Sequence, residues 1–183
     1  MKNLLKLFFE IGILKNIRRS GWFAINIKNP ESIAEHSFRC AIIGYFLSKM
    51  EKADTEKIVT MCLFHDISET RMGDFNILTK KYVKNHERIE EMILEDQIKP
   101  IDQKWLLSLM KEYNSRKTKE AIIAKDADLL ECAIQAKEYF DMGYEKAKIW
   151  IENVKRELKT ESAKKILLAL EKSDSTDWWK DLL

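Results

Sequence analysis

The sequence has few of the residues that make tight turns. Its 183 residues include only 5 Gly and 2 Pro. β-Sandwiches and β-barrels need many more turn-forming residues than this, and doubly wound α/β folds need a Gly-rich turn after a strand, which is missing here. These absences argue against all-β and α/β folds, and we expect an all-α protein.

Cysteines and long apolar runs are also scarce. The three cysteines, Cys40, Cys62 and Cys132, lie in apolar helical patterns without CxxC spacing, which indicates reduced core residues of a cytoplasmic protein. No run of about 18 apolar residues is present, so we expect no membrane-spanning segment. Lys6 and Glu10 interrupt the N-terminal apolar run, and we therefore do not expect a signal peptide.

Neither sign of charge dominates the sequence. Lys and Arg total 32, Asp and Glu total 30, and the net charge is +2. This balance gives no support to a protein that binds nucleic acid polymers or membrane surfaces. The hydrophobic share of 45% is enough for a sizeable core, and a chain of this length without linkers fits one domain, residues 1–183.

Apolar residues recur at helical spacing along most of the chain. The pattern predicts helices at residues 3–17, 31–50, 54–73, 84–96, 101–113, 117–140, 144–158 and 161–181, with an extended stretch before Pro30 and a loop at 74–82. We expect the first helix to use Leu4, Leu5, Phe8, Phe9, Ile11 and Leu14 as its apolar stripe, and the second to turn Ile33, His36, Phe38, Ala41, Ile42 and Phe46 inward. These elements predict a single helical bundle with short connections.

The last helices, within residues 144–181, carry no recognisable motif. We expect them to pack on the rest of the bundle or on a second subunit. The chain ends with Trp178-Trp179 and Leu182-Leu183, which is unusual for a terminus. Of the two arrangements for these tryptophans, we favour docking on the core of the same chain over docking on a second subunit.

Only three histidines occur, so each can be weighed singly. His65 is followed at once by Asp66, but such a pair can arise by chance, and alone it is better explained as a core histidine beside an exposed aspartate. His36 lies in an apolar helical pattern 29 residues earlier. That separation allows a helix, a turn and an antiparallel helix, so the two imidazoles can meet and bind a divalent metal together with Asp66.

A third part of such a site could come from the long helix at 117–140. Asp126 and Asp128 are about 200° apart around a helix, so we expect only one of them to face the core. Asp128 is adjacent to Leu129 and close to Cys132. A carboxylate on an apolar face must be paired or bind a metal, and the alternative for Asp128 is a buried ion pair, for instance with an arginine.

The residues around these positions resemble a known family. They fall into four blocks in order: Arg19-Ser20-Gly21-Trp22, Pro30 to Ser37, His65 to Asp74, and Lys125 to Asp128. The blocks read R-x-G-W, P-E-S-x-x-E-H, H-D-x-x-E-x-x-x-G-D and K-D-x-D. They resemble the HD-domain metal-dependent phosphohydrolases, and in particular the 5′-deoxynucleotidase branch that includes the HD-domain-containing protein 2 group. The resemblance covers residues 10–140; the His-Asp pair marks the superfamily only, whereas the longer blocks are more specific.

The resemblance implies a fold, a cofactor and a reaction. The fold would be the HD-domain helical bundle, and the assembly a homodimer. His36, His65, Asp66 and Asp128 would hold one divalent transition metal such as Mn, Co, Ni, Fe or Zn. The reaction would convert deoxyribonucleoside 5′-monophosphates to deoxynucleosides and phosphate. Because His86 is the only further histidine, and we expect it on a solvated helix face, a single metal is expected.

The resemblance also implies roles for four further residues. Glu69 would be the catalytic acid or base, Arg19 would contact the 5′-phosphate, Trp22 would pack near the sugar 2′-carbon, and Asp74 would accept a hydrogen bond from the 3′-hydroxyl. Each role has a plainer alternative: a solvated helix carboxylate for Glu69, a basic helix end for Arg19 and a turn residue for Asp74. Phe75 and the residues after it depart from the family pattern and leave the base preference open.

Three other functions remain open on the sequence alone. The same metal ligands could serve a phosphodiesterase or a nucleoside triphosphate hydrolase. The chain could also be a catalytically silent module that senses nucleotides. The plainest alternative is a helical scaffold with a buried polar cluster. The complete ligand set together with Glu69 favours the monophosphate hydrolase among these.

Overall fold

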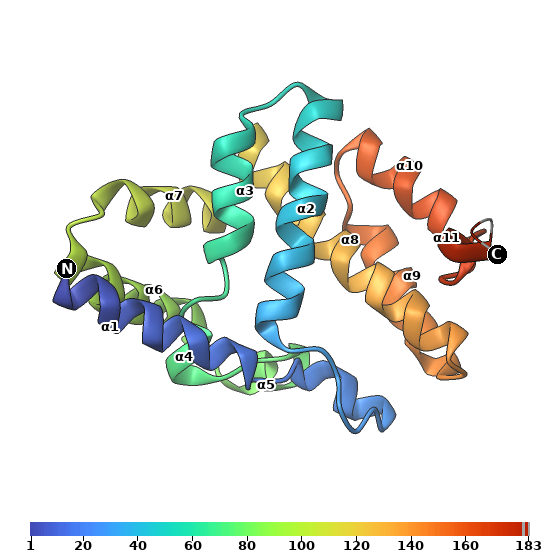
Figure 1. The fold of residues 1–183 in the computed structure, drawn as a ribbon, viewed down its shortest axis with the longest axis horizontal. Helices are drawn as coiled ribbons and strands as arrows, with labels where there is room; N and C mark the ends of the chain where they lie inside the picture. Colours follow the sequence, from blue (N-terminus) through green and yellow to red (C-terminus); the bar gives the residue numbers. More distant parts are fainter. Residues whose placement is uncertain (181, 183) are drawn as a thin grey trace.

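A computed structural model describes residues 1–180 and 182, and within them the regular structure is helical (Figure 1). Three helices form the centre of the bundle: α2 (Ile33–Glu51), α3 (Thr55–Phe64) and α8 (Lys119–Asp141). The other helices are α1 (Lys2–Ile11), α4 (Glu69–Met72), α5 (Ile77–Tyr82), α6 (His86–Ile98), α7 (Lys104–Ser115), α9 (Lys148–Glu157), α10 (Glu161–Leu170) and α11 (Asp177–Lys180). The expected all-α fold is confirmed.

Shorter elements join these helices. Among the described residues, four 3₁₀ segments occur, at Gly12–Lys15, Ser20–Ile25, Lys99–Ile101 and Glu145–Ala147. The second of them falls in the stretch predicted to be extended, so that prediction is wrong for these residues. Across the described residues, no helix combines the length and the apolar character that crossing a lipid bilayer requires.

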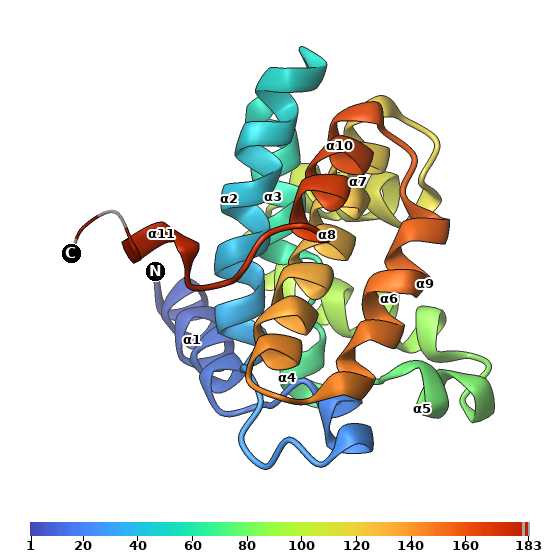
Figure 2. The ribbon, with the colours of Figure 1, turned by 90° about the vertical axis from the view of Figure 1, so that its right-hand side faces the viewer.

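The centre of the bundle depends on a close approach between α2 and α3. A Cβ atom on Gly44 of α2 would lie 2.8 Å from Cys62 Sγ and 3.2 Å from Ile58 Cγ2, both on α3. Only a residue without a side chain fits this distance. α8 packs against both helices, as Figure 2 also shows. The three helices that carry the expected metal ligands therefore meet in one core.

The start of α2 is fixed on the N-terminal segment. Ser32 caps the helix through a reciprocal pair of bonds, because its hydroxyl accepts from the Glu35 N–H at 3.2 Å and its own N–H donates to Glu35 Oε2 at 2.6 Å. An isolated β-bridge joins Ser32 to Arg18. These contacts place the segment that carries Arg19 beside the first turn of α2, one turn before His36.

The predicted inward faces of the first two helices are wrong in part. Phe38, Ile42 and Phe46 of α2 are exposed, and so are Leu5, Phe8 and Phe9 of α1. The stripe of α2 that is buried consists of Ile33, His36, Ser37, Cys40, Ala41, Gly44, Leu47 and Ser48. α2 is apolar on most of its circumference, so periodicity could not identify which stripe meets α3 and α8.

Two predicted helices are shorter than expected. α3 ends at Phe64 rather than near Gly73, and α4 begins separately at Glu69. The helix expected at 161–181 ends at Leu170, and α11 follows as a separate element. Trp178 is 77% exposed, so the preferred docking on the chain's own core is wrong for this tryptophan, whereas Trp179 is 38% exposed. Residues 181 and 183, which belonged to these predictions, lie outside the described residues.

Candidate metal centre

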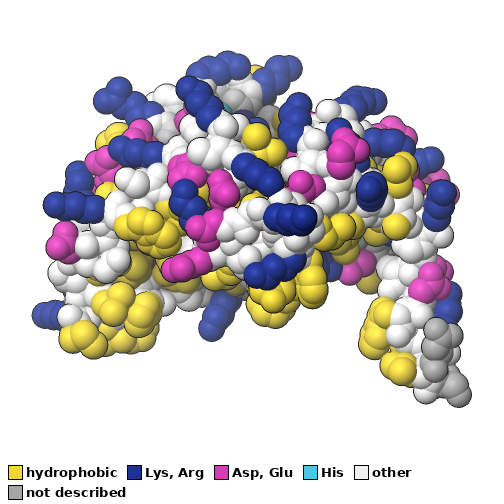
Figure 3. Space-filling view, turned by 90° about the horizontal axis from the view of Figure 1, so that it is seen from above, with side chains coloured by type: hydrophobic (Ala, Val, Ile, Leu, Met, Phe, Trp, Pro, Cys, Tyr) yellow, Lys and Arg dark blue, Asp and Glu magenta, His cyan; other side chains and the backbone are white. Residues whose placement is uncertain are grey.

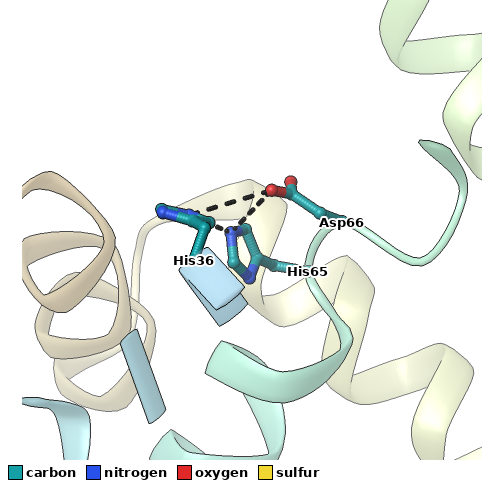
Figure 4. Close-up of side chains that lie close together, drawn as sticks. All are labelled: His36, His65 and Asp66. Atoms are coloured by element: carbon teal, nitrogen blue, oxygen red, sulfur yellow. Dashed lines mark hydrogen bonds and ion pairs between the residues drawn. The ribbon is translucent and has the colours of Figure 1, made fainter. Parts of the chain in front are cut away.

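The four expected ligands meet between α2, α3 and α8. His36 comes from α2, His65 caps the C-terminal end of α3, Asp66 follows it, and Asp128 comes from α8. His36 Nε2 lies 3.3 Å from His65 Nε2, and His65 Nε2 lies 3.1 Å from Asp66 Oδ2 (Figure 4). His36 Nε2 also lies 3.1 Å from Asp128 Oδ1. The structure thus brings together all four residues that the sequence indicated.

The hydrogen bond that each histidine makes through Nδ1 determines whether its Nε2 faces the centre with a lone pair or with a proton. His65 Nδ1 lies 2.8 Å from the Cys62 carbonyl oxygen, and His36 Nδ1 contacts the Glu131 carboxylate. Carbonyl and carboxylate oxygens accept hydrogen bonds, so both Nδ1 atoms carry protons. In their neutral forms, both histidines then point Nε2 lone pairs at each other across 3.3 Å. Two facing lone pairs next to two carboxylates fit a bound cation.

The donor chemistry narrows the choice of cation. Two imidazole nitrogens and two carboxylate oxygens suit Mn²⁺, Fe²⁺, Co²⁺, Ni²⁺ or Zn²⁺, whereas Ca²⁺ prefers a shell made of oxygen atoms. His36 is completely buried, and Asp128 is 8% exposed. A metal held here would therefore be shielded by protein on the side of α2 and α8.

Positive charges around the centre keep the two candidate carboxylate ligands, Asp66 and Asp128, ionised. Burial raises the pKa of Asp66, but His65, Arg19 and His36 outweigh it and hold the pKa well below its usual range. Burial likewise opposes ionisation of Asp128, and Lys125 and His36 outweigh it. Burial and Arg19 lower the pKa of His36, yet Glu131 and Asp128 raise it to about 10. In the absence of a metal, a proton on His36 therefore supplies positive charge here.

Asp128 has polar contacts besides the histidines. Lys125 Nζ lies 2.5 Å from Asp128 Oδ2, and the Tyr113 hydroxyl donates to the same oxygen at 3.4 Å. The ion pair considered for Asp128 thus exists with a lysine rather than an arginine, and it leaves Oδ1 facing His36. Lys125 pairs with one oxygen while the other faces the centre.

The expectation that only one of the two α8 aspartates would be buried is wrong. Asp126 is 1% exposed. Its carboxylate accepts from the backbone N–H groups of Lys159 and Thr160 and from the Thr160 hydroxyl, at 2.7 to 3.1 Å. Because α10 covers the other side of α8, opposite faces of this helix are both internal. Asp126 therefore anchors the start of α10, away from the metal centre.

Glu69 lies at the first position of α4, after the turn that follows Asp66. It is only 6% exposed, and among the described residues nothing hydrogen-bonds to its Oε2. Burial, and next the charge of Asp66, raise its pKa well above the usual value, with Arg19 opposing. The alternative of a solvated helix carboxylate is therefore wrong, because Glu69 is buried and its pKa is raised.

Arg19 and Asp74 form an ion pair. One Arg19 nitrogen, Nη1, lies 3.3 Å from Asp66 Oδ2 and 3.3 Å from Asp74 Oδ1. Asp74 Oδ2 accepts from the backbone N–H of Ser20 at 2.7 Å and from its hydroxyl at 2.5 Å. Asp74 thus anchors the segment that carries Arg19, and Arg19 lies directly against one of the candidate metal ligands.

Trp22 lies behind the site rather than at its surface. It is 2% exposed and packs against Tyr139 and Trp150, with ring centroids 5.0 and 4.9 Å apart. Its indole N–H donates to Glu31 Oε1 at 3.2 Å. A contact between Trp22 and a sugar therefore requires movement of the groups that cover it, and this role stays a prediction.

A groove of about 850 Å³ runs beside the centre, between α6 and α7. His65 and Ser68 line it, together with charged side chains of both signs: Lys80, Arg88, Lys111 and Arg116, and Glu87, Glu90 and Glu91. His86, expected on a solvated helix face, also lines this groove. The groove is of the size that holds small-molecule ligands.

The sequence analysis missed two charged residues next to the centre. Glu131 is completely buried and contacts His36, and Arg39 donates to Glu131. A signal was available, because Glu131 follows Asp128 by three residues and therefore lies on the same face of α8. Its place among the alanines and leucines of that face marked it as a carboxylate that needs a partner.

Comparisons with known proteins show which family the chain belongs to. A family model described as HD domain matches residues 11–169. The 5′-deoxynucleotidase HDDC2 of Dictyostelium discoideum is 34% identical over 76% of this chain and 78% of its own length, and the protein of the same name from Bos taurus is 33% identical over 77% and 70%. A solved structure of a coding region from Archaeoglobus fulgidus is 33% identical, with a TM-score of 0.73 over 98% of this chain and all of its own. The chain belongs to the HD-domain family.

Proposed function

We propose that this protein is a 5′-deoxynucleotidase, which hydrolyses deoxyribonucleoside 5′-monophosphates to deoxynucleosides and phosphate with one bound divalent transition metal. The observation that carries the proposal is the convergence of four metal-binding side chains beside the buried acid Glu69. The names of the relatives support the substrate class, since they too are called 5′-deoxynucleotidases.

His36, His65, Asp66 and Asp128 would hold the metal. When bound there, such a metal lowers the pKa of a water molecule and offsets the charge that develops on the phosphoryl group. Arg19 lies against Asp66 at 3.3 Å and would bind oxygens of the 5′-phosphate with N–H groups that do not face Asp66 or Asp74. The phosphate would then lie between the arginine and the metal ligands.

Glu69 would supply the proton that the leaving group needs. Hydrolysis of a phosphomonoester leaves a 5′-oxygen that must be protonated, and a carboxylic acid that stays neutral near pH 7 can do this. Burial raises the pKa of Glu69 and so favours its neutral form. Its unpaired Oε2 is free to donate to an incoming oxygen.

The groove beside His65 would hold the nucleoside. Its volume of about 850 Å³ accommodates a sugar and a base, and its lining mixes cationic side chains such as Lys80 and Arg88 with three glutamates. Asp74 would accept from the 3′-hydroxyl, and Trp22 would disfavour a 2′-hydroxyl. A mismatch of that kind can discriminate strongly between deoxyribose and ribose.

We also propose that the protein acts as a cytoplasmic homodimer of single-domain subunits. Free cysteines support the compartment, since Cys40 and Cys62 are buried as thiols. Exposed phenylalanines on α1 and α2 support a second subunit.

Phosphate release from several substrates tests the reaction. The protein is stripped with a chelator, refilled in turn with Mn²⁺, Co²⁺, Ni²⁺, Zn²⁺ and Mg²⁺, and given dAMP, dTMP, AMP, dATP or a phosphate diester. We expect release from the deoxymonophosphates, weak release from AMP and none without metal. Activity confined to the diester or to dATP would move the substrate class to a phosphodiesterase or a triphosphate hydrolase.

Absence of turnover with every metal would have a different meaning. If the metal-loaded protein bound dAMP without releasing phosphate, a nucleotide-sensing module would replace the enzyme. If no divalent metal bound and chelator had no effect on thermal unfolding, a scaffold with a buried polar cluster would be the better description.

A further inference from the structure

We propose that Glu131 and Arg39 are positioning residues of the metal centre: Glu131 fixes the tautomer and the ring orientation of His36, and Arg39 fixes Glu131. This inference rests on the metal site proposed above. Its tests measure metal binding and the position of a proton, so that its failure can be distinguished from failure of the enzymatic proposal.

The first step of the argument is the contact between Glu131 and His36. Both side chains are completely buried, and Glu131 Oε2 accepts from His36 Nδ1. An ionised carboxylate cannot donate, so this contact holds the histidine proton at Nδ1. The lone pair is then held at Nε2, the atom that lies 3.1 Å from Asp128 Oδ1 and 3.3 Å from His65 Nε2. Histidines that bind metals are oriented and made more basic by acceptors in this position.

The second step is the attachment of Glu131 itself. Arg39 Nε lies 2.9 Å from Glu131 Oε1, and Arg39 Nη2 lies 2.8 Å from the same oxygen. The other donors of this guanidinium reach Gln135 Oε1 at 2.8 Å and Glu138 Oε1 at 2.6 Å. Each oxygen of Glu131 therefore has its own donor, Oε2 from His36 and Oε1 from Arg39. The carboxylate cannot rotate without losing both.

The third step is the spacing along the two helices. His36 and Arg39 are three residues apart on α2, and Asp128 and Glu131 are three residues apart on α8. Residues at this spacing lie on one face of a helix, so each helix presents one metal ligand and, a turn further, one anchoring residue. The Arg39 guanidinium donates hydrogen bonds to the side chains at positions 131, 135 and 138 of α8 and thereby fixes α8 against α2. The distance between His36 and Asp128 is set by this attachment.

The variant Glu131→Gln separates charge and hydrogen bonding from shape. In this variant Arg39 still donates toward Oε1, so the amide oxygen turns toward Arg39 and the amide NH₂ group faces His36. A donor facing Nδ1 requires Nδ1 to accept, which moves the proton to Nε2 and blocks the metal-binding lone pair. We expect the Kd for Mn²⁺ or Zn²⁺ to rise about 10- to 100-fold. Circular dichroism should show unchanged helix content.

A double variant distinguishes positioning from a general structural role. In Arg39→Met combined with Glu131→Gln, the amide oxygen is released from Arg39 and can accept from His36 Nδ1. We expect this double variant to bind metal more tightly than Glu131→Gln alone. A structural role predicts the opposite, because two changes in a buried network weaken it more than one. Glu152→Gln, an exposed substitution on α9 outside this network, is the matched control, and the metal Kd should change less than about 3-fold.

The wild-type protein gives a direct readout that needs no variant. The ¹⁵N chemical shifts of His36 in the Zn²⁺-loaded protein report which ring nitrogen carries the proton. We expect Nδ1 to be protonated and Nε2 to be bound to the metal. Protonation of Nε2, or equal metal affinity of wild type and Glu131→Gln, would overturn the inference. A wild-type protein that binds no divalent metal would overturn the proposed function, and this inference with it.

Discussion

His36 lies between two carboxylates, Asp128 and Glu131, which contact opposite nitrogens of its ring. A third carboxylate, Asp66, lies beside it, and Glu31 is held close by. When no metal is bound, protons and the nearby cations Arg19, Arg39 and Lys125 balance this negative charge. The stability of the metal-free protein should therefore depend on pH.

The direction of this dependence follows from two raised pKa values. Folding raises the pKa of His36 from 6.5 to about 10, and burial followed by Glu131 raises that of Glu31 from 4.5 to about 7. The folded protein holds protons that the unfolded chain releases. The stabilisation from these protons is complete below the pKa values of the unfolded chain, 6.5 for His36 and 4.5 for Glu31, and it is lost as the pH rises through the folded-state values of about 10 and about 7. We expect the Tm of chelator-treated protein to fall by at least about 5 °C between pH 6 and pH 9.

Calorimetry at several pH values with and without Mn²⁺ checks this expectation. Metal binding displaces the proton from His36 Nε2, so the stabilisation by metal should grow as the pH rises. A Tm of metal-free protein that increases from pH 6 to pH 9 would contradict the charge balance described here.

Glu69 yields a prediction about the chemical step. The variant Glu69→Gln keeps the size of the side chain but has no acidic proton to give to a leaving oxygen. We expect kcat with dAMP to fall about 10²- to 10⁴-fold while the metal Kd stays unchanged, because Glu69 is not among the four ligands. Phosphate release and metal titration measure the two effects. Glu152→Gln, an exposed substitution on α9, serves as the control, and normal turnover by Glu69→Gln would rule out the proton-donor role.

At the scale of elements, the site depends on how closely α2 and α3 approach each other. At Gly44 a Cβ atom would lie 2.8 Å from Cys62 Sγ, which is buried and cannot move aside easily. We expect Gly44→Ala to lower the free energy of unfolding by about 1–3 kcal/mol despite the better helix propensity of alanine. It should also weaken metal binding, since the two helices carry His36 and His65.

Gly12→Ala is the matched control for this substitution. Gly12 has φ −56° and ψ −22°, and no atom lies within 4 Å of the position of its Cβ. There the same change should leave the stability equal or raise it by up to about 1 kcal/mol. Chemical denaturation of both variants makes the comparison. Equal effects at the two positions would mean that the helices can separate at Gly44 without cost.

The sequence predicted the existence of most helices better than their ends and faces. α3 was expected to continue beyond His65 to near Gly73, and no Gly or Pro lies between residues 65 and 72. The Cys62 carbonyl, which an uninterrupted helix pairs with the N–H of residue 66, accepts from His65 Nδ1. That side-chain bond depends on the orientation of His65 in the assembled core, which helical periodicity does not encode.

The same distinction applies to the site residues. His36, His65, Asp66 and Asp128 were recognisable because their types and order follow a family pattern. Glu131 was not, because its function depends on contact with His36 across two helices, 95 residues apart in sequence. Trp22 matched the pattern by position, yet the structure buries it among aromatic rings. A pattern identifies positions, whereas only packing shows what each side chain can reach.

At the scale of the whole molecule, large apolar side chains gather on the surface. Leu5, Phe8 and Phe9 of α1 are 52%, 58% and 72% exposed, and Phe38 and Phe46 of α2 are 66% and 59% exposed. Figure 3 shows hydrophobic side chains grouped along one side of the molecule, and also on the segment that projects from it. Surface apolar groups on this scale mark a contact with another molecule.

The C-terminal segment extends from the same molecule without covering that surface. Figure 2 shows α11 reaching away from the body, and its Trp178 is 77% exposed. A helix of four residues is not stable in isolation. In the proposed homodimer, the tryptophans of this segment would be covered by the second subunit.

The variant Phe46→Glu tests whether the exposed face of α2 is the surface between subunits. Phe46 is exposed in the single chain, so a charge there costs the fold little, but burying it in a subunit contact costs several kcal/mol. We expect wild-type protein to sediment as a species of twice 21.6 kDa and Phe46→Glu to sediment near 21.6 kDa. Ile149→Glu, at a similarly exposed apolar position on α9, should leave the mass unchanged. A wild-type monomer would exclude the homodimer, whereas a dimeric Phe46→Glu would place the contact on another face.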